Sequence, residues 1–507
     1  MNIFELLDYL LLISYIVPSL LLMFFGLNLY FSLGLCLRRL GKARKEVTCV
    51  ADDFQLQHTE TDLPHVVTQL PVYNEINVVE RAMRAAAAMS YPKGRHTIQV
   101  LDDSTDDTRD LVDRIANELN AAGHDFQVVR RTHREGFKAG ALSYGMEVTD
   151  AQFFAIFDAD FVPPVDFLMR TVPVLVMKKE IGLVQARWGH LNEKSSFLTI
   201  AQGLGIDAHF AVEQPARAWN NLFMTFNGTA GLWRKQAIID AGGWQNDTLT
   251  EDMDLSYRSQ LAGWKPFFIS DLVVEGEIPD NINAFKIQQF RWAKGSIQTA
   301  IKLLPRVFRS DFSWLAKMEA FFHMTYYGIF PLMVWVALLT LPIYRLIHLS
   351  LSSLAFTLLS VLLAGSAMAP PVLCVAAQLI LKKEGWKKLI YFPALLALGI
   401  GIAISNSRAV IEAVLGIKSA FIRTPKKGQN AFRLYNLRFS YGVILELLVG
   451  LYCFGAFAYF LHIHNYMAIP YLLINGLGFT IVGLLSIWHF VNQNMEIKQE
   501  ELPEPVS

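Results

Sequence analysis

The sequence predicts an α/β domain with a mostly parallel sheet, attached to an α-helical membrane domain. Hydrophobic residues make up 53% of the 507 residues, and they concentrate in the first 35 residues and beyond about residue 318. Between these regions, short apolar runs alternate with helical patterns, which is typical of parallel strands joined by right-handed crossovers. Because the chain is too long for one compact domain, we expect a membrane anchor over 1–47, a soluble domain over 48–310 and membrane helices over 311–507.

Charge and cysteine content argue against two classes of function. The 45 basic and 45 acidic residues cancel, so no overall basic character indicates a nucleic-acid partner. Four cysteines are scattered without paired spacing, which favours neither a disulfide framework nor a thiolate metal site.

The first apolar run, Leu10 to Leu37, is longer than the roughly 20 residues that a bilayer requires. No small-residue cleavage site follows it, so a retained anchor is expected rather than a cleaved signal peptide. Glu5 and Asp8 precede the run, and five basic residues follow it: Arg38, Arg39, Lys42, Arg44 and Lys45. The positive-inside rule therefore predicts an outside amino terminus and a cytoplasmic soluble domain.

After a polar linker ending near Pro64, the soluble domain is expected to alternate strands and helices. The expected strands are Val66 to Leu70, Thr97 to Leu101, Phe126 to Val129 and Phe153 to Phe157. The expected helices are Asn77 to Met89, Thr108 to Ala122 and Lys138 to Glu147. Acids and turn residues follow several of these strands, and one crevice at the carboxyl edge of the sheet would collect them.

Asp158 and Asp160 follow the apolar run Gln152 to Phe157, and Pro163 and Pro164 then stop the strand. Two carboxylates this close repel each other unless a cation lies beside them. Hard oxygen ligands suit Mg²⁺ or Mn²⁺, and such an ion would hold a diphosphate. The alternative is an acidic turn that merely ends a strand.

Other turn residues are candidates for binding a nucleotide. Tyr73, after the first strand, can stack on a base, and Asp102 or Asp103 can accept hydrogen bonds from a uracil or guanine edge. Lys138 opens a helix just after Gly136, where backbone amides and the ammonium group favour a phosphate. Packing of the tyrosine, helix capping by the acids and a solvated lysine are the alternatives.

Asp252 lies in an acidic cluster, Leu249 to Asp254, that can cap a helix. It is also a candidate general base. A hydroxyl that displaces a nucleotide diphosphate from a sugar must lose its proton on the side opposite the leaving group.

An amphipathic helix is expected over Asn283 to Lys302. Its residues Gln288, Arg291 and Trp292 share one face, because their spacing is i, i+3, i+4. Arg291 can pair with a diphosphate. Trp292 offers an indole plane to a sugar ring or, alternatively, anchors the helix at the lipid surface.

In this order and spacing, these residues resemble the inverting family 2 glycosyltransferases of the GT-A fold, especially the membrane-embedded cellulose-synthase-like branch. The motifs are Gln69 to Glu75, Asp102-Asp103, Asp158-Ala159-Asp160, Thr250-Glu251-Asp252 and Gln288-x-x-Arg291-Trp292. The stretches that look particularly like plant mannan and glucan synthases are Glu135 to Leu142, Gln185 to Trp188, Asn227 to Arg234 and Gly242 to Trp244. The resemblance is close over residues 64 to 305 and loose over the membrane part.

The resemblance implies a role for each matched residue. The nucleoside would be held by Tyr73, Glu75 and Asp102 or Asp103, and its phosphates contacted by Lys138.

The reaction centre follows from the same resemblance. Asp158 and Asp160 would bind Mg²⁺ or Mn²⁺, and Asp252 would be the base. The remaining substrate-binding residues would be Asn227, Gly228, Thr229, Gln288, Arg291 and Trp292, with Arg291 on the leaving group and Trp292 beside the acceptor.

Five further apolar runs approach or exceed bilayer length. They are Phe321 to Leu349, Leu354 to Leu381, Leu389 to Ser405, Tyr441 to His462 and Ile469 to Val491. Basic clusters at 382–388 and 418–438 should both be cytoplasmic, yet one crossing between them would separate them. Polar residues continue the same helix to about residue 414, so we favour a re-entrant or surface helix and leave the crossing open.

Residues 418–438 include Phe421 to Gly428, which looks like a degenerate form of the gating loop that closes over donor in cellulose synthases. Arg423 stands where that family has valine. The alternative is a plain basic loop beside the membrane.

The leading hypothesis is a multi-pass membrane enzyme with a cytoplasmic site. It would move glucose or mannose from UDP-glucose or GDP-mannose to a growing β-linked polysaccharide. The alternative is a glycolipid synthase that glycosylates diacylglycerol, ceramide or another lipid. A transporter with a regulatory nucleotide-binding domain is disfavoured, because the sequence shows no repeated, pseudo-symmetric spans.

Overall fold

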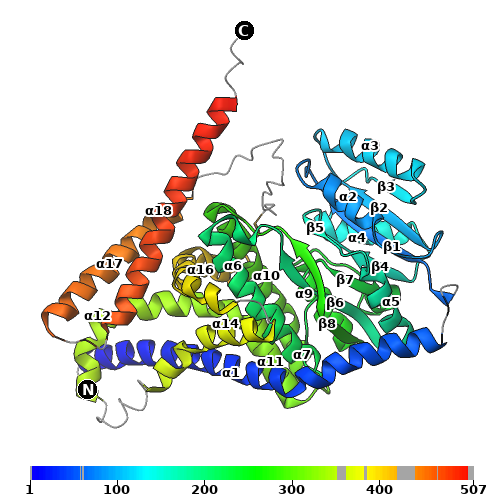
Figure 1. Ribbon diagram of the computed structural model, residues 1–507. Helices are drawn as coiled ribbons and strands as arrows, with labels where there is room; N and C mark the ends of the chain where they lie inside the picture. The colour runs from blue at the N-terminus through cyan, green and yellow to red at the C-terminus, as the bar shows by residue number, and fades with distance from the viewer. Residues whose placement is uncertain are drawn as a thin grey trace, which may run out of the picture.

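The computed structural model describes residues 3–57, 59, 62–350, 361–381, 385–419, 440–464, 466 and 468–500. Figure 1 shows an α/β unit on one side and a bundle of long helices on the other. The long first helix runs along the base of both units.

Among the described residues, eight strands form one sheet in the order β3-β2-β1-β4-β7-β6-β8-β5. The strands are β1 Val66–Val72, β2 His96–Asp102, β3 Phe126–Val129, β4 Phe153–Ile156, β5 Phe161–Val162, β6 Ile181–His190, β7 Gly231–Arg234 and β8 Lys265–Gly276. The first four are parallel to one another, as expected, and β6 is parallel to β8. By contrast, β7 is antiparallel to both its neighbours and β5 to β8.

The register of the parallel strands brings their carboxyl ends to one edge. Val72 of β1 pairs with Asp102 of β2, so the turns that contain Tyr73 and Asp103 leave the sheet side by side. Both faces of the sheet are buried, which explains why these strands read as nearly continuous apolar runs.

Helices cover both faces of the sheet. One apolar cluster takes side chains from α2 Val79–Ala87, α3 Thr108–Ala121 and α5 Phe167–Met177. The cluster on the other face takes them from α4 Phe137–Glu147, α8 Lys235–Asp240 and α9 Glu251–Leu261. Between β6 and β7 the chain forms α6 Phe197–Ala208, a π-helical turn His209–Glu213 and α7 Gln214–Ala218.

The first helix, α1 Ile3–Gln57, continues through the stretch expected to be a polar linker. Val50 and Phe54 are 7% and 6% exposed and belong to the same apolar cluster as β1. Burial of these side chains against the α/β unit outweighs the polar composition around them, so the helix persists to residue 57.

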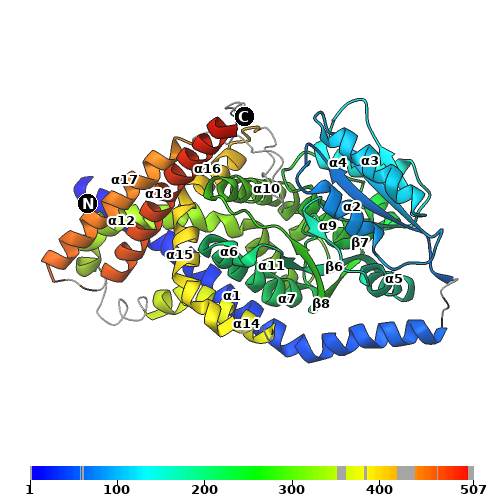
Figure 2. The same cartoon turned by 45° about the horizontal axis from the view of Figure 1, so that its top comes forward.

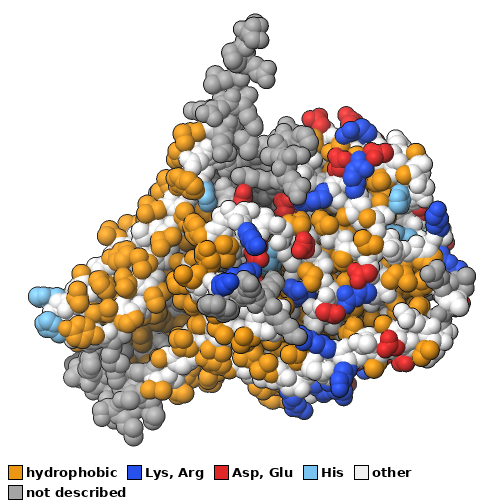
Figure 3. Space-filling model, in the orientation of Figure 1, with side chains coloured by type: hydrophobic (Ala, Val, Ile, Leu, Met, Phe, Trp, Pro, Cys, Tyr) orange, Lys and Arg blue, Asp and Glu red, His pale blue; other side chains and the backbone are white. Residues whose placement is uncertain are grey.

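The helical unit begins with α10 Ile282–Arg309, which lies between the sheet and the other long helices in Figure 2. After it come α11 Trp314–Thr325, α12 Ile329–Ser350, α14 Ala369–Ile380, α15 Phe392–Gly401, α16 Ala403–Val414, α17 Gly442–His462 and α18 Ile469–Glu500. In the part of the chain that the structure describes, five helical stretches are long and apolar enough to cross a membrane. They are Leu6–Gln57, Trp314–Tyr344, Val361–Ile380, Gly442–His462 and Ile469–Met495. Figure 3 shows hydrophobic side chains gathered over this side of the molecule.

The pair α15 and α16 bends by 40° at a short break. This geometry fits either a broken span or a re-entrant loop, so the expected re-entrant or surface helix stays a prediction. Residues 420–438 of the gating-like loop lie outside the described residues.

Candidate active site

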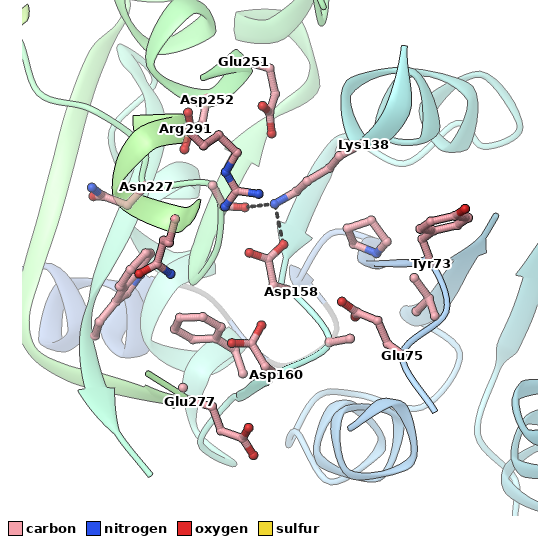
Figure 4. Close-up of a pocket in the computed structure, with 18 of the residues that line it drawn as sticks. Tyr73, Glu75, Lys138, Asp158, Asp160, Asn227, Glu251, Asp252, Glu277 and Arg291 are labelled. Atoms are coloured by element: carbon pink, nitrogen blue, oxygen red, sulfur yellow. Dashed lines mark hydrogen bonds and ion pairs between the residues drawn. The ribbon is translucent and has the colours of Figure 1, made fainter. Parts of the chain in front are cut away.

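One pocket lies at the carboxyl edge of the sheet and is closed on one side by α10. It is lined by most of the residues that the sequence singled out: Tyr73, Glu75, Asp103, Lys138, Asp158, Asp160, Asn227, Gly228, Asp252, Gln288, Arg291 and Trp292. The pocket therefore brings together groups from seven separate parts of the chain, and Figure 4 shows several of them around one space.

Asp102 and Thr229 lie just behind this lining. The Asp102 carboxylate is buried, where Oδ2 accepts from Arg130 Nε at 2.8 Å and Oδ1 from the Ser104 amide at 3.0 Å. The Thr229 hydroxyl accepts from the Asp158 amide at 3.0 Å. Both residues shape the turns that carry pocket residues, and of the two neighbouring aspartates it is Asp103 that lines the pocket.

The end of the pocket near β1 and β2 has the chemistry of a nucleoside site. The guanidinium carbon of Arg134 lies 3.4 Å from the centre of the Tyr73 ring, a cation–π stack that presents a flat surface. Arg131 pairs with Asp103, its Nε lying 3.1 Å from Oδ1, and so holds that carboxylate in place. A planar base can stack on such a surface while the carboxylate accepts from its edge.

Asp158 and Asp160 lie in the middle of the pocket, after β4. Lys138 Nζ is ion-paired with Asp158 and donates to the Gly228 carbonyl at 2.8 Å. In Figure 4 the Lys138 and Arg291 side chains both point toward Asp158. Two cations that converge on one point beside two carboxylates form a place for a diphosphate.

The two aspartates fit a divalent metal ion of the Mg²⁺ type. Among the described residues, no group of three or more His, Cys, Asp or Glu could hold a metal ion by itself. Mg²⁺ is commonly bound by one or two carboxylates plus phosphate oxygens and water. The donor set is therefore one that a diphosphate would complete.

Asp252 lies at the start of α9, above the two cations in Figure 4. Its Oδ1 accepts from the Met253 amide at 2.8 Å. Burial and the neighbouring Glu251 carboxylate raise the pKa of Asp252 to about 7, although the charges of Lys138 and Arg291 act in the opposite direction. A carboxylate with this pKa is suited to proton transfer near neutral pH.

The small residues at 227–230 allow this close arrangement. Gly228 has a φ of +79°, and a Cβ there would lie 2.9 Å from Asp252 Oδ2 and 3.5 Å from Lys138 Nζ. Glycine is therefore needed both for the backbone conformation and for the space between the acid and the lysine.

Burial alone would lower the pKa of Lys138, but the carboxylates of Asp158, Glu251 and Asp252 outweigh it and raise that pKa. Lys138 thus stays cationic at the point where the phosphates would lie.

Helix α10 packs directly on the turn before Asp252. A Cβ at Gly295 would lie 2.5 Å from Thr250 Cγ2, so this glycine permits the close approach. The Thr250 and Thr299 hydroxyls are 3.2 Å apart, and the Leu249 amide donates to Gln298 Oε1 at 3.0 Å. These contacts hold the candidate base in a fixed relation to the helix that carries Arg291.

Several pocket residues were not selected from the sequence: Arg134, Trp188, His190, Glu251 and Glu277. Trp188 and Glu251 lie within motifs given above, and Arg134 directly precedes one. Glu277 directly follows β8, so the strand-end argument used for Asp158 could have found it. It is paired with Arg81 at 2.8 Å.

Comparison with known proteins shows which proteins this domain resembles. Residues 64–295 match the family described as "Glycosyltransferase like family 2". The chain is 40% identical over 315 residues to a probable glucomannan 4-beta-mannosyltransferase 7 of Oryza sativa subsp. japonica. The aligned region covers 58% of this chain and 54% of that protein. It is 44% identical over 236 residues to glucomannan 4-beta-mannosyltransferase 1 of Cyamopsis tetragonoloba, with 46% and 45% covered. The chain spans about half the length of these curated relatives.

A solved mannosyltransferase of Pyrobaculum calidifontis, in complex with GDP-Man and Mn²⁺, is 18% identical, with a TM-score of 0.45. The alignment covers 78% of this chain and 100% of that one. This likeness is too low to bear on activity. Residues 64–295 are therefore similar to the family 2 glycosyltransferases, as the motifs predicted, and their mostly parallel sheet agrees with the expected α/β fold.

Proposed function

We propose that this protein transfers a hexose from a nucleotide sugar to a growing β-linked polysaccharide at a membrane, with inversion at the sugar carbon. The observation that carries the proposal is the pocket itself. It places a carboxylate with a pKa of about 7 beside a site with two cations and two further carboxylates. The names of the relatives support a mannosyl donor such as GDP-mannose, with UDP-glucose as the other candidate.

In this proposal, Tyr73, Arg134 and Asp103 hold the nucleoside, and Glu75 borders it. The diphosphate lies between Lys138 and Arg291. Asp158 and Asp160 would hold Mg²⁺ or Mn²⁺, and the bound ion would supply positive charge to the leaving group.

Asp252 takes the proton of the acceptor hydroxyl as that oxygen forms a bond to the sugar carbon. The bond between this carbon and the diphosphate oxygen breaks, and its electron pair leaves with the diphosphate. Arg291 and Lys138 stabilise the charge that develops there. Because base and leaving group are on opposite sides of the carbon, its configuration inverts.

The acceptor would enter beside Trp292 and Asn227. The Asn227 side chain is oriented by Gln214, whose amide donates to Asn227 Oδ1, and it lies 3.4 Å from His209 Nε2. An indole plane beside an oriented amide suits a sugar ring. The apolar C–H face of the sugar can stack on the indole, and its hydroxyl groups can bond to the amide.

The proposed setting is a bilayer crossed by the apolar helices, with the pocket on the cytoplasmic side, where nucleotide sugars are made. The basic residues that follow the apolar part of α1 support this orientation: Arg38, Arg39, Lys42, Arg44 and Lys45.

The test is transfer from labelled UDP-glucose and GDP-mannose by the purified protein in detergent, with Mg²⁺ or Mn²⁺. Products are sorted into lipid-extractable and insoluble fractions, and the insoluble part is digested with glucanase or mannanase. We expect an insoluble product made from GDP-mannose and sensitive to mannanase. A product found only in the lipid fraction would instead favour the glycolipid synthase. Absence of transfer from a panel of nucleotide sugars would overturn both.

A further inference from the structure

Two faces of helix α10 contact different parts of the protein. Gln288, Arg291 and Trp292 line the pocket, while Lys286 and Lys294 are buried on the side away from it. At 100° per residue, the two lysines are centred about 150° around the helix from the pocket residues. A rotation of α10 that disturbs one face therefore disturbs the other.

Lys286 reaches into the apolar hairpin formed by α17 and α18. Its Nζ lies 2.6 Å from Glu446 Oε2 and 2.7 Å from Ser486 Oγ. Lys286 is 7% exposed and Glu446 is 1% exposed. Glu446 belongs to Gly442–His462, a stretch apolar enough to cross a membrane. An ionisable group in such a place is costly and needs a buried partner, so a packing role alone would be served better by apolar residues.

The contacts next to this pair involve the same hairpin. The Ile282 amide donates to His489 Nδ1 at 3.0 Å, and Asn283 Nδ2 donates to the Ser486 carbonyl at 3.1 Å. The first turn of α10 is therefore attached to α18 by directional bonds.

Lys294 makes the corresponding contact on the other side of Arg291. It is fully buried, and its Nζ lies 2.8 Å from Glu412 Oε2 on α16. Glu412 Oε1 in turn accepts from Arg408 Nε at 2.8 Å. The pocket residues of α10 thus lie between two lysine–glutamate pairs that join it to different helices of the apolar unit.

We propose that Lys286 and Glu446 are positioning residues: their ion pair sets the rotation of α10 and so aims Arg291 and Trp292 into the pocket. Apolar side chains can slide past one another, whereas a hydrogen-bonded ion pair specifies one register. The apolar hairpin α17–α18, far from the sheet in Figure 1, then controls how well the leaving group is held. This inference rests on the proposed glycosyl transfer and adds a residue pair that does not contact substrate.

The test is a cycle of variants assayed for donor kcat and KM. Removal of one partner alone would leave a buried charge and destabilise the protein, so both are made neutral, as Lys286→Met with Glu446→Gln. We expect kcat to fall about tenfold or more while the donor KM changes less than about threefold, because the nucleoside site is distant from this pair. In an Arg291→Ala background, the same two changes should lower kcat by less than about threefold, since only their effect through Trp292 remains.

The matched control is Lys388→Met with Glu193→Gln. This ion pair also joins the apolar unit to the α/β unit but does not involve α10. It should leave kcat within about twofold of the wild type. Ser486→Ala removes only the contact between Lys286 Nζ and Ser486 Oγ. It should lower kcat by a smaller factor than the double variant, again with little change in the donor KM. This variant replaces the double variant if Lys286→Met with Glu446→Gln does not fold.

An unchanged kcat in these variants, or an equal fall with and without Arg291, would overturn the positioning role. Lack of transfer by the wild-type protein would instead overturn the proposed function, and the positioning role with it.

Discussion

Asp252 joins features that rarely occur in one carboxylate. It opens a helix, it touches the turn at Gly228, and burial beside Glu251 raises its pKa to about 7. A capping aspartate with no further role would gain nothing from this burial. The environment therefore favours a carboxyl group that can accept and release a proton near neutral pH.

Asp252→Asn should abolish transfer and leave donor binding intact. The amide keeps the shape of the side chain but cannot take a proton, and loss of a general base costs about 10²–10⁴ in rate. Transfer is measured with labelled donor, and binding by titration calorimetry of the nucleoside diphosphate with Mg²⁺. Asp110→Asn, on an exposed turn of α3, is the control and should be fully active. Equal activity of the Asp252 variant would dismiss it as the base.

The pH dependence should report the same group. Because a base must be ionised, kcat/KM should be constant above pH 7 and fall about tenfold per pH unit well below it. A profile that stays flat down to pH 5 would contradict the raised pKa.

Stability should show the opposite trend. The pKa of Asp252 is raised from 3.8 to about 7 on folding, so the folded protein binds this proton more tightly than the unfolded chain. Its contribution disfavours folding increasingly as pH rises from about 4 to about 7. We expect Asp252→Asn to unfold at a higher temperature than the wild type at pH 8, with the difference vanishing near pH 4. Thermal unfolding in detergent measures this.

Chelation should remove activity reversibly if Asp158 and Asp160 hold a metal ion. EDTA should stop transfer, and excess Mg²⁺ or Mn²⁺ should restore it. Asp160→Asn should need a higher concentration of the ion for half-maximal activity, whereas Asp110→Asn should not. Transfer that persists in EDTA would count against the metal site.

At the scale of elements, the relation between α9 and α10 matters most. The two helices come together only because Gly295 has no side chain opposite Thr250. One of them carries the candidate base, and the other carries the arginine for the leaving group.

Gly295→Ala should therefore lower kcat strongly while the protein still folds. A Cβ would meet Thr250 Cγ2 at 2.5 Å and the Thr250 amide at 2.8 Å, so the helices must separate. We expect at least a tenfold loss of kcat, measured at saturating donor, because displacement of a reacting group by about 1 Å can cost 10²-fold. Gly34→Ala on α1, where a Cβ would meet nothing within 4 Å, is the matched control. Comparable activity in both variants would show that this approach is not needed.

At the scale of the whole molecule, α1 links the apolar unit to the α/β unit. Its upstream part is apolar, and its last turns pack into the sheet core through Val50 and Phe54. The orientation of the α/β unit therefore follows from the orientation of this one helix.

Cys49 offers a direct measurement of this orientation, since it is exposed on α1 while Cys36, Cys374 and Cys453 are buried. A membrane-impermeant maleimide should label the protein in inverted vesicles and not in intact cells, if the soluble domain is cytoplasmic. Cys49→Ser should remove the label. Labelling of intact cells would place the pocket on the other side.

Residues that are close together in the chain specify the local elements and the chemistry at their ends. The sequence predicts the strands and helices from Val66 to Ile156 to within two residues at each end, because alternating strand and helix periods are local properties. The face shared by Gln288, Arg291 and Trp292 follows from helical spacing alone. The acids at strand ends follow from the way that parallel strands share an edge.

Packing between distant segments specifies which of these residues act together. The choice between Asp102 and Asp103 depends on Arg130 and Arg131, which come from another strand end. Three other features depend on residues that are distant in the chain. They are the antiparallel insertion of β7, the pKa of Asp252 and the buried ion pair between Lys286 and Glu446. Burial and charge pairing arise from packing between elements, and no local pattern specifies that packing.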